Sequence, residues 1–311
     1  MTGALRPTEL PAVGPAALTL GVFDGVHRGH RHLLDALRAE AVRAGAASVA
    51  ILFDPNPDEV IRGITVPRLA PTAMNARWIE ETGVDHAIAM RFDDELRNLE
   101  PEEFLDALAP AIDLRAFVTT EGSAFGRKRA GTVERVRELG AGRGFEVSTV
   151  QPLEADGEPV SSSRVRAALA AGDIGEAREL LGRRPFLQGV VVHGDRRGRS
   201  LGFPTANLRF AYTPALPERG IYLGFCGVAE RGVAAGHPAL VSVGIRPTFH
   251  PDGEVLVEVY LLDWDGDLYD ATLSLEIDAR LRDERRFEHV DALVDQMRAD
   301  EAEARRLLGE A

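Results

Sequence analysis

The amino-acid sequence predicts an α/β protein with two domains, a parallel sheet followed by a module of antiparallel strands. The chain has 311 residues, which suits two domains of the usual ~100–200 residues. In its first half, short apolar runs alternate with helix-like segments, as in a doubly wound sheet. In its second half, strand-like runs follow one another too closely for helices to lie between them.

The composition is that of a globular protein, and it excludes several function classes. Apolar residues make up 45% and charged residues 27% of the chain, and the net charge is −13. This negative charge repels a phosphate backbone, so we expect no nucleic-acid partner. No stretch approaches the ~18 apolar residues of a membrane span, and we expect neither a secretory signal nor a membrane partner. The single cysteine, Cys226, excludes an internal disulfide and favours the cytoplasm.

Five strands and four helices are expected in the first half. The strand-like runs are continuously apolar, as in sheets that are buried on both faces, and the helices repeat apolar residues at helical spacing. The expected strands cover residues 17–23, 48–53, 85–90, 117–120 and 145–150. The expected helices cover residues 28–44, 73–81, 101–108 and 133–140.

A domain boundary is expected at residue 183, which divides the chain into residues 1–183 and 184–311. A helical stretch over residues 163–181 ends there, and a glycine and a proline flank two arginines. The amphipathic pattern of residues 290–308 predicts a terminal helix. The strand-like runs between them predict an antiparallel barrel or a sandwich. These runs cover residues 186–192, 221–228, 239–243, 255–262 and 271–277.

A first candidate site follows the first strand, where residues 21–30 read GVFDGVHRGH. His27 and His30 lie three positions apart at a helix start, and therefore on one face. The N–H groups and the positive dipole end of that helix favour phosphate, and two imidazoles can stabilise charge that develops on it. Gly25 and Gly29 would allow phosphate oxygens to approach the backbone. A pair of metal ligands and a pair of surface histidines are the alternatives.

A second helix start carries a run of hydroxyls and an arginine. Such a helix end predicts a second phosphate site, facing the histidines across the point where the strand order reverses. The alternative is a serine cap followed by solvated arginines. The residues of this run are Ser161, Ser162, Ser163 and Arg164.

A third candidate site lies in residues 189–207, which read GVVVHGDRRGRSLGFPTAN. Its glycines can wrap phosphates with backbone N–H groups, and its arginines add positive charge. Thr205 and Asn207 offer two oxygen ligands of the kind that Mg²⁺ prefers. By itself, the glycine–arginine loop is also compatible with a simple hairpin turn. The residues expected to bind phosphate groups in this loop, which the resemblance given below assigns to ATP, are Gly194, Arg196, Gly198 and Arg199.

These segments resemble the prokaryotic bifunctional riboflavin kinase/FAD synthetases over residues 17–308. Residues 21–30 are similar to the family's G-x-F-D-G-x-H-x-G-H signature, residues 53–57 to its F-x-P-x-P loop and residues 160–166 to its I-S-S-T-x-I-R segment. The resemblance implies a Rossmann-like nucleotidyltransferase domain that adenylylates FMN to FAD and uses the two histidines. The nucleotide contacts that it implies are Phe23, Gly25, Asn56, Ser161, Ser162, Ser163 and Arg164.

The second half resembles the riboflavin kinase module of the same family. The resemblance implies a β-barrel that transfers the γ-phosphate of ATP to riboflavin, with Phe203 among the ATP contacts and Mg²⁺ held by Thr205 and Asn207. By resemblance, Glu258 is the general base for the riboflavin 5′-hydroxyl. Strand alternation puts its side chain on the face opposite those of its two neighbours. The similar segments are residues 202–207 (GFPTAN), 244–249 (GIRPTF) and 257–263 (VEVYLLD).

Four departures from the family pattern concern the first domain. Asn56 stands where histidine is common, Asn75 where lysine is usual, and Gly122 and Ser123 where an acidic or amide residue precedes phenylalanine. A monofunctional riboflavin kinase with a non-catalytic first domain is therefore the main alternative. A non-catalytic regulator that binds flavin or nucleotide and a nucleotidyltransferase for another phosphorylated substrate are two others. The expected small-molecule partners are ATP, riboflavin, FMN and FAD, and the sequence indicates no protein partner.

Overall fold

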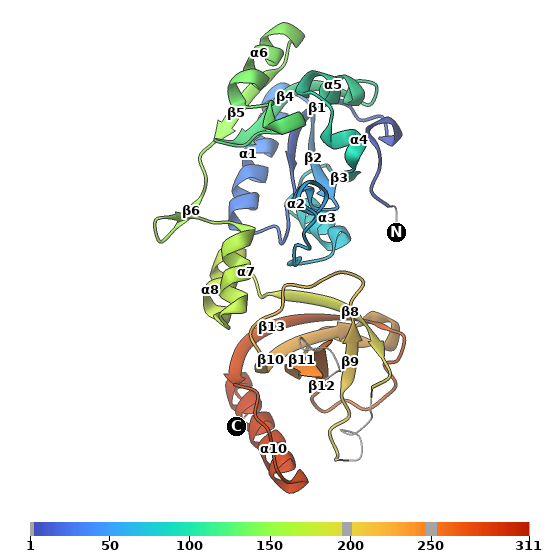
Figure 1. The fold of residues 1–311 in the computed structure, drawn as a ribbon, viewed down its shortest axis with the longest axis vertical. Helices are drawn as coiled ribbons and strands as arrows, with labels where there is room; N and C mark the ends of the chain where they lie inside the picture. The colour runs from blue at the N-terminus through green and yellow to red at the C-terminus, as the bar shows by residue number, and fades with distance from the viewer. Residues whose placement is uncertain (1–2, 195–200, 247–253, 311) are drawn as a thin grey trace. The chain divides into compact units, whose positions relative to one another are not determined.

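The computed structural model of the chain describes residues 3–194, 201–246 and 254–310 (Figure 1). Backbone contacts divide the chain into two compact units. The first unit comprises Met1–Val66 and Pro71–Ser162, and the second comprises Pro67–Ala70 and Ser163–Ala311. The domain boundary expected at residue 183 stays a prediction. The division expected from the sequence and the division given by contacts differ mainly in the helical segment before residue 183. Contacts assign this segment to the second unit.

The first unit is built on a sheet of parallel strands in the order β3-β2-β1-β4-β5, with helices beside it (Figure 1). This confirms the expected Rossmann-like α/β fold. The strands of the sheet are β1 (Gly14–Gly21), β2 (Ala47–Asp54), β3 (His86–Arg91), β4 (Ile112–Thr120) and β5 (Glu146–Val150). The helices are α1 (Arg28–Ala44), α2 (Pro57–Arg62), α3 (Thr72–Glu81), α4 (Asp94–Arg97), α5 (Pro101–Leu108) and α6 (Val133–Arg143). A short hairpin of β6 (Glu154–Ala155) and β7 (Glu158–Pro159) precedes the second unit.

Alternate residues of β1 enter two separate cores, which explains why its sequence is continuously apolar. Leu18 packs in one core with Phe104 of α5 and Phe117 of β4. Ala17 packs in the other core, which contains the inner face of α1. The strand order reverses between β1 and β4, and open α/β sheets bind ligands at the carboxyl ends of the strands at such a point. The histidine segment begins there, at the last residue of β1.

The second unit contains a closed barrel with the strand order β10-β11-β12-β9-β8-β13, in which every neighbouring pair is antiparallel. The structure thus decides for a barrel where the strand pattern left a sandwich open. Strand β9 was not expected from the sequence. It has only four residues, which follow closely after a proline, and its apolar and polar residues alternate too little to indicate a strand. The strands are β8 (Phe186–Val192), β9 (Ala206–Arg209), β10 (Gly220–Val228), β11 (Val233–Arg246), β12 (Glu254–Leu261) and β13 (Thr272–Arg282).

Within the described residues, three α-helices accompany the barrel in sequence: α7 (Ser162–Ala170), α8 (Ile174–Leu181) and α10 (Val290–Leu308). The prediction of one continuous helical stretch over residues 163–181 is wrong in one respect, because the helix is interrupted between α7 and α8. Gly172 has a φ of +73°, which a right-handed helix cannot continue. Asp173 then caps α8 by accepting a hydrogen bond from the Glu176 N–H at 2.8 Å. The expected terminal helix, α10, is confirmed.

Candidate active sites

The chain after β1 makes a sharp turn before it enters α1. Phe23, Gly25 and Val26 have φ angles of +52°, +77° and +37°. Left-handed backbone is uncommon for non-glycine residues and often marks functional sites. Gly21 makes room for this turn, since a Cβ there would lie 2.9 Å from the Phe23 ring. The buried Phe23 ring lies 5.1 Å from the His30 ring, so the turn packs directly against the histidine pair.

His27 and His30 are stacked on each other at the start of α1. Their ring centroids are 3.6 Å apart, and the rings are tilted by 16°. The Nδ1 atom of His27 accepts a hydrogen bond from the His30 N–H at 3.2 Å, so His27 caps the helix. A neutral His27 therefore carries its proton on Nε2. The structure brings the two predicted histidines together, and it gives His27 a capping role that sequence reasoning missed.

Two other segments of the first unit hold the turn in place. Asn75 of α3 is buried, and its Oδ1 accepts a hydrogen bond from the Gly25 N–H at 3.0 Å. Ser162 donates its hydroxyl to the carbonyl oxygen of Asp24 at 2.8 Å. Gly25 was expected to allow phosphate oxygens to approach the backbone, and in the structure its N–H donates to Asn75. A residue that the sequence marked only as a departure thus positions the loop.

Asn56 has a structural role at the start of α2. Its Oδ1 accepts a hydrogen bond from the Asp58 N–H at 3.0 Å, and its own N–H donates to Glu59 at 3.1 Å. Asn56 and Glu59 also form a capping box, which satisfies backbone donors at a helix start. The asparagine–proline pair of the FDPNP segment therefore begins a helix. Nucleotide contact by Asn56 stays a prediction.

The serine run lies where the two units divide along the chain. Ser161 and Ser162 belong to the first unit, whereas Ser163 and Arg164 belong to the second. Arg164 forms an ion pair with Glu176 at 3.0 Å, within the second unit. The phosphate site expected across this run therefore stays a prediction. What the structure adds is the bond from Ser162 to the loop before α1.

Gly122 and Ser123 line a pocket of about 340 Å³ beyond the carboxyl end of β4. Gly122 has a φ of +78°, and no atom lies within 4 Å of the place where its Cβ would be. The departure from the family pattern thus leaves open space. Arginine and glutamate side chains surround it, since Arg129, Arg137, Glu121 and Glu134 line the same pocket.

The second unit brings Thr205, Asn207 and Glu258 together. The Thr205 hydroxyl donates to the Glu258 carboxylate at 3.3 Å. Asn207 of β9 is the direct partner of Glu258 of β12 in the antiparallel register, so their side chains lie on the same face. Gly194 adjoins them, because a Cβ on it would lie 2.3 Å from the Asn207 amide nitrogen. Four separate predictions therefore meet at one place.

A cavity of about 810 Å³ opens beside these residues, within the size range of small-molecule sites. The valines on either side of Glu258 are fully buried, which confirms that its side chain lies on the opposite face. Ser242 of β11, paired with Glu258 in the register, extends the polar row. The rest of the lining is mainly apolar and comes from β8, β10, β11 and β12, from the loop after β12 and from α10. The apolar lining residues include Leu240, Leu256, Tyr260, Trp264, Leu293 and Met297.

Several cavity residues were not expected from the sequence. Ser242 and Tyr260 could have been found from the two-residue period of their strands, whereas Met297 lies on a helix that carries no motif. Burial raises the pKa of Tyr260, so its hydroxyl stays protonated at neutral pH. Phe203 is buried, and its ring meets the Tyr260 ring edge-on at 5.3 Å. The predicted ATP contacts Arg196, Gly198 and Arg199 lie outside the described residues.

Two family models match the chain, one for each unit. The FAD synthetase model matches residues 11–164, and the riboflavin kinase model matches residues 181–308. Between them they cover both candidate sites. Among the described residues, no helix has the length and apolar character needed to cross a membrane.

Curated relatives match over nearly the whole chain. A bifunctional riboflavin kinase/FMN adenylyltransferase of Pseudomonas fluorescens is 38% identical over 97% of this chain and 95% of its own length. The enzyme of the same name from Escherichia coli K12 is 34% identical with the same coverage. A crystal structure titled macrolide-efflux protein, from Streptococcus pneumoniae, has a TM-score of 0.85 and 29% identity, and covers 96% of this chain and 97% of that one.

The curated names favour the bifunctional interpretation over the monofunctional one. They pair a kinase with an adenylyltransferase, and the two family models divide in the same way. The departures at Gly122 and Ser123 do not alter this result, because the relatives match through both units. The chain belongs to the family of bifunctional riboflavin kinase/FMN adenylyltransferases.

Proposed function

We propose that the cavity of the second unit is where riboflavin is phosphorylated, with Glu258 as the general base. Glu258 accepts the proton of the 5′-hydroxyl while the hydroxyl oxygen attacks the γ-phosphorus of ATP. The bond from that phosphorus to ADP breaks, and FMN and ADP leave. The 3.3 Å contact from Thr205 to Glu258 carries this proposal, because it joins the PTAN turn to the strand carboxylate.

Magnesium fits the donor set of this site. Thr205 and Asn207 provide hydroxyl and amide oxygens, and Asn207 is 7% exposed and faces Glu258 across the strand pair. A hydroxyl that donates its proton to Glu258 keeps lone pairs for a cation. We infer that these two oxygens hold Mg²⁺ together with water and ATP phosphates, as Mg²⁺ prefers. The bound ion would neutralise charge on the transferred phosphate.

The second reaction belongs to the first unit in this proposal. The FMN phosphate attacks the α-phosphorus of ATP, pyrophosphate leaves, and FAD forms. His27 and His30 donate hydrogen bonds to the reacting phosphates at the start of α1, where the helix dipole also favours negative charge. Positioning and electrostatics carry this transfer, and it needs no covalent enzyme intermediate.

The buried Cys226 is in keeping with a reducing compartment, so we place both reactions in the cytoplasm.

Replacing Glu258 by glutamine tests the kinase proposal. The amide has nearly the same shape but cannot act as a carboxylate base, so we expect FMN formation from riboflavin to fall about 10²–10⁴-fold. FAD formation from supplied FMN should stay within twofold, and Glu230→Gln, at an exposed site of the same unit, should leave both rates unchanged. A Glu258→Gln variant that still forms FMN at the wild-type rate would remove Glu258 from the mechanism.

A further inference from the structure

Helix α10 contributes to the kinase cavity with only part of its length. Leu293, Met297 and Asp300 follow one another at helical spacing and line the cavity. Further along the same face, Ala304 is fully buried and packs in a core with Leu223 and other barrel residues. The apolar anchor of α10 therefore lies in its C-terminal half. Its N-terminal half forms a wall of the cavity.

A charged pair lies where the anchored half meets the cavity wall. Arg282, the last residue of β13, binds Asp300 through two parallel hydrogen bonds, each of 2.7 Å. The two side chains are 13% and 6% exposed. Gln296 donates to the same carboxylate at 2.9 Å, and Arg282 also donates to the Asp283 carbonyl oxygen at 2.9 Å. Such a bidentate pair fixes direction as well as distance.

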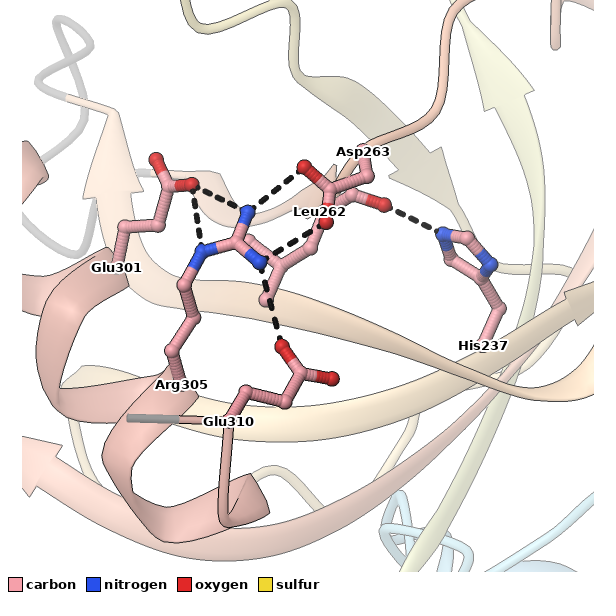
Figure 2. Close-up of polar contacts among 6 residues, drawn as sticks. All are labelled: His237, Leu262, Asp263, Glu301, Arg305 and Glu310. Atoms are coloured by element: carbon pink, nitrogen blue, oxygen red, sulfur yellow. Dashed lines mark hydrogen bonds and ion pairs between the residues drawn. The ribbon is translucent and has the colours of Figure 1, made fainter.

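The C-terminal half of α10 has its own attachment, shown in Figure 2. Arg305 binds both carboxylate oxygens of Asp263, at 2.9 and 2.7 Å, and also binds Glu301 and Glu310. Asp263 lies in the loop after β12. Loss of the Arg282–Asp300 pair would therefore leave the helix attached by Arg305 and by the Ala304 core, so its effect should be confined to the cavity wall.

We propose that Arg282 and Asp300 are positioning residues for riboflavin. The inference rests on the proposed function, in which the cavity holds the substrate of the kinase. Riboflavin has a large planar ring system, and Leu293 and Met297 offer that ring an apolar wall from α10. The buried pair sets where this wall stands relative to the barrel, whereas the polar row of Thr205, Asn207 and Glu258 comes from other strands. The pair should therefore govern riboflavin binding and leave ATP binding unchanged.

Asp300→Asn tests the pair, with Asp295→Asn as the matched control on the exposed side of the same helix. Binding is measured by the quenching of riboflavin fluorescence, which does not depend on turnover. We expect the riboflavin Kd and KM of Asp300→Asn to rise about tenfold, while the KM for ATP and kcat stay within about twofold. Asp295→Asn should match the wild type in every quantity.

A second variant separates positioning from folding. Asparagine at 300 leaves the Arg282 charge uncompensated, which destabilises a protein more than removal of the whole pair. The double variant Arg282→Met/Asp300→Leu removes both charges, and we expect it to fold and still bind riboflavin about tenfold more weakly. A wild-type riboflavin Kd in the double variant overturns the inference, as does an equal weakening for ATP. If the wild-type chain binds riboflavin but forms no FMN, this contradicts only the proposed function. The role of the Arg282–Asp300 pair is still decided by comparing the riboflavin Kd of the variants with that of the wild type.

Discussion

At Gly194, a hydrogen atom is the largest substituent that the proposed kinase site accommodates. A Cβ there would lie 2.3 Å from the amide nitrogen and 2.8 Å from the amide oxygen of Asn207. The sequence suggested that this glycine frees backbone N–H groups for phosphate. The structure adds a second reason, which is that Asn207 needs the space to reach its place beside Glu258.

Gly194→Ala should therefore impair the kinase through Asn207. Because the new methyl group displaces the Asn207 amide, we expect the apparent affinity for magnesium in riboflavin phosphorylation to fall about tenfold. The change is measured by titrating Mg²⁺ at saturating ATP. Gly142→Ala serves as the control, since no atom lies within 4 Å of the Cβ that it would add. Equal magnesium titrations for Gly194→Ala and the wild type would contradict the proposed metal site.

Single residues also show where sequence reasoning ends. The PTAN turn, Glu258 and the histidine pair were found from their motifs. The hydrogen bond from the Gly25 N–H to Asn75 was not found in this way. It joins positions that are 50 residues apart, and it depends on how α3 packs. Asn56 caps α2, a role that its position before Pro57 also predicts, and its expected contact with a nucleotide stays a prediction.

At the scale of elements, α3 supports the loop that presents the histidines. Asn75→Ala would leave the buried Gly25 N–H without this acceptor, at a cost of about 1–3 kcal/mol. We expect FAD formation from FMN to fall about tenfold, because the loop loses its fixed conformation, and riboflavin phosphorylation to stay unchanged. Both rates are measured by separating the flavins. Asn98→Ala, on the exposed surface of the first unit, is the control. An unaltered FAD rate would mean that Asn75 is dispensable for positioning.

The strands β2 and β3 are joined by a pH-sensitive contact. Asp85 accepts hydrogen bonds from the Ser48 hydroxyl at 2.6 Å and the Ser48 N–H at 2.8 Å, and these bonds lower the pKa of its carboxyl group. A carboxylate with a lowered pKa stabilises the fold above its unfolded pKa of about 3.9, and this contribution is lost as the pH falls through the folded pKa.

Asp85→Asn should accordingly have a lower melting temperature (Tm) than the wild type at neutral pH, and a Tm closer to that of the wild type in acid. The variant lacks the titrating carboxylate, so the gap between the two Tm values should narrow as the pH falls below about 4. Thermal unfolding followed between neutral and acidic pH measures this gap. Asp156→Asn, at an exposed hairpin position, should show no such trend. A gap that widens in acid would refute the assigned direction.

At the scale of the whole molecule, a substitution in one unit should abolish the activity of that unit and leave the activity of the other unit unchanged. His27→Asn removes an imidazole but keeps a side chain that caps helices well. We expect FAD formation to fall about 10²–10³-fold, as for other lost transition-state donors. Incubated with riboflavin, ATP and Mg²⁺, this variant should accumulate FMN, which chromatography detects. If FMN formation fell with FAD formation, the two reactions would not occupy separate units.

The sequence by itself determined the fold class, the order of most elements and the motifs at their ends. Those features depend on local spacing, such as the apolar runs of the parallel strands and the glycines and prolines between elements. Only the tertiary structure decided that the barrel closes and that Thr205 meets Glu258, which lies 53 positions further along the chain. The reason is physical, since β9 is too short to be recognised alone and its side chains take their direction from pairing with β8 and β12. Such pairing depends on contacts between residues far apart in sequence, and local pattern does not contain them.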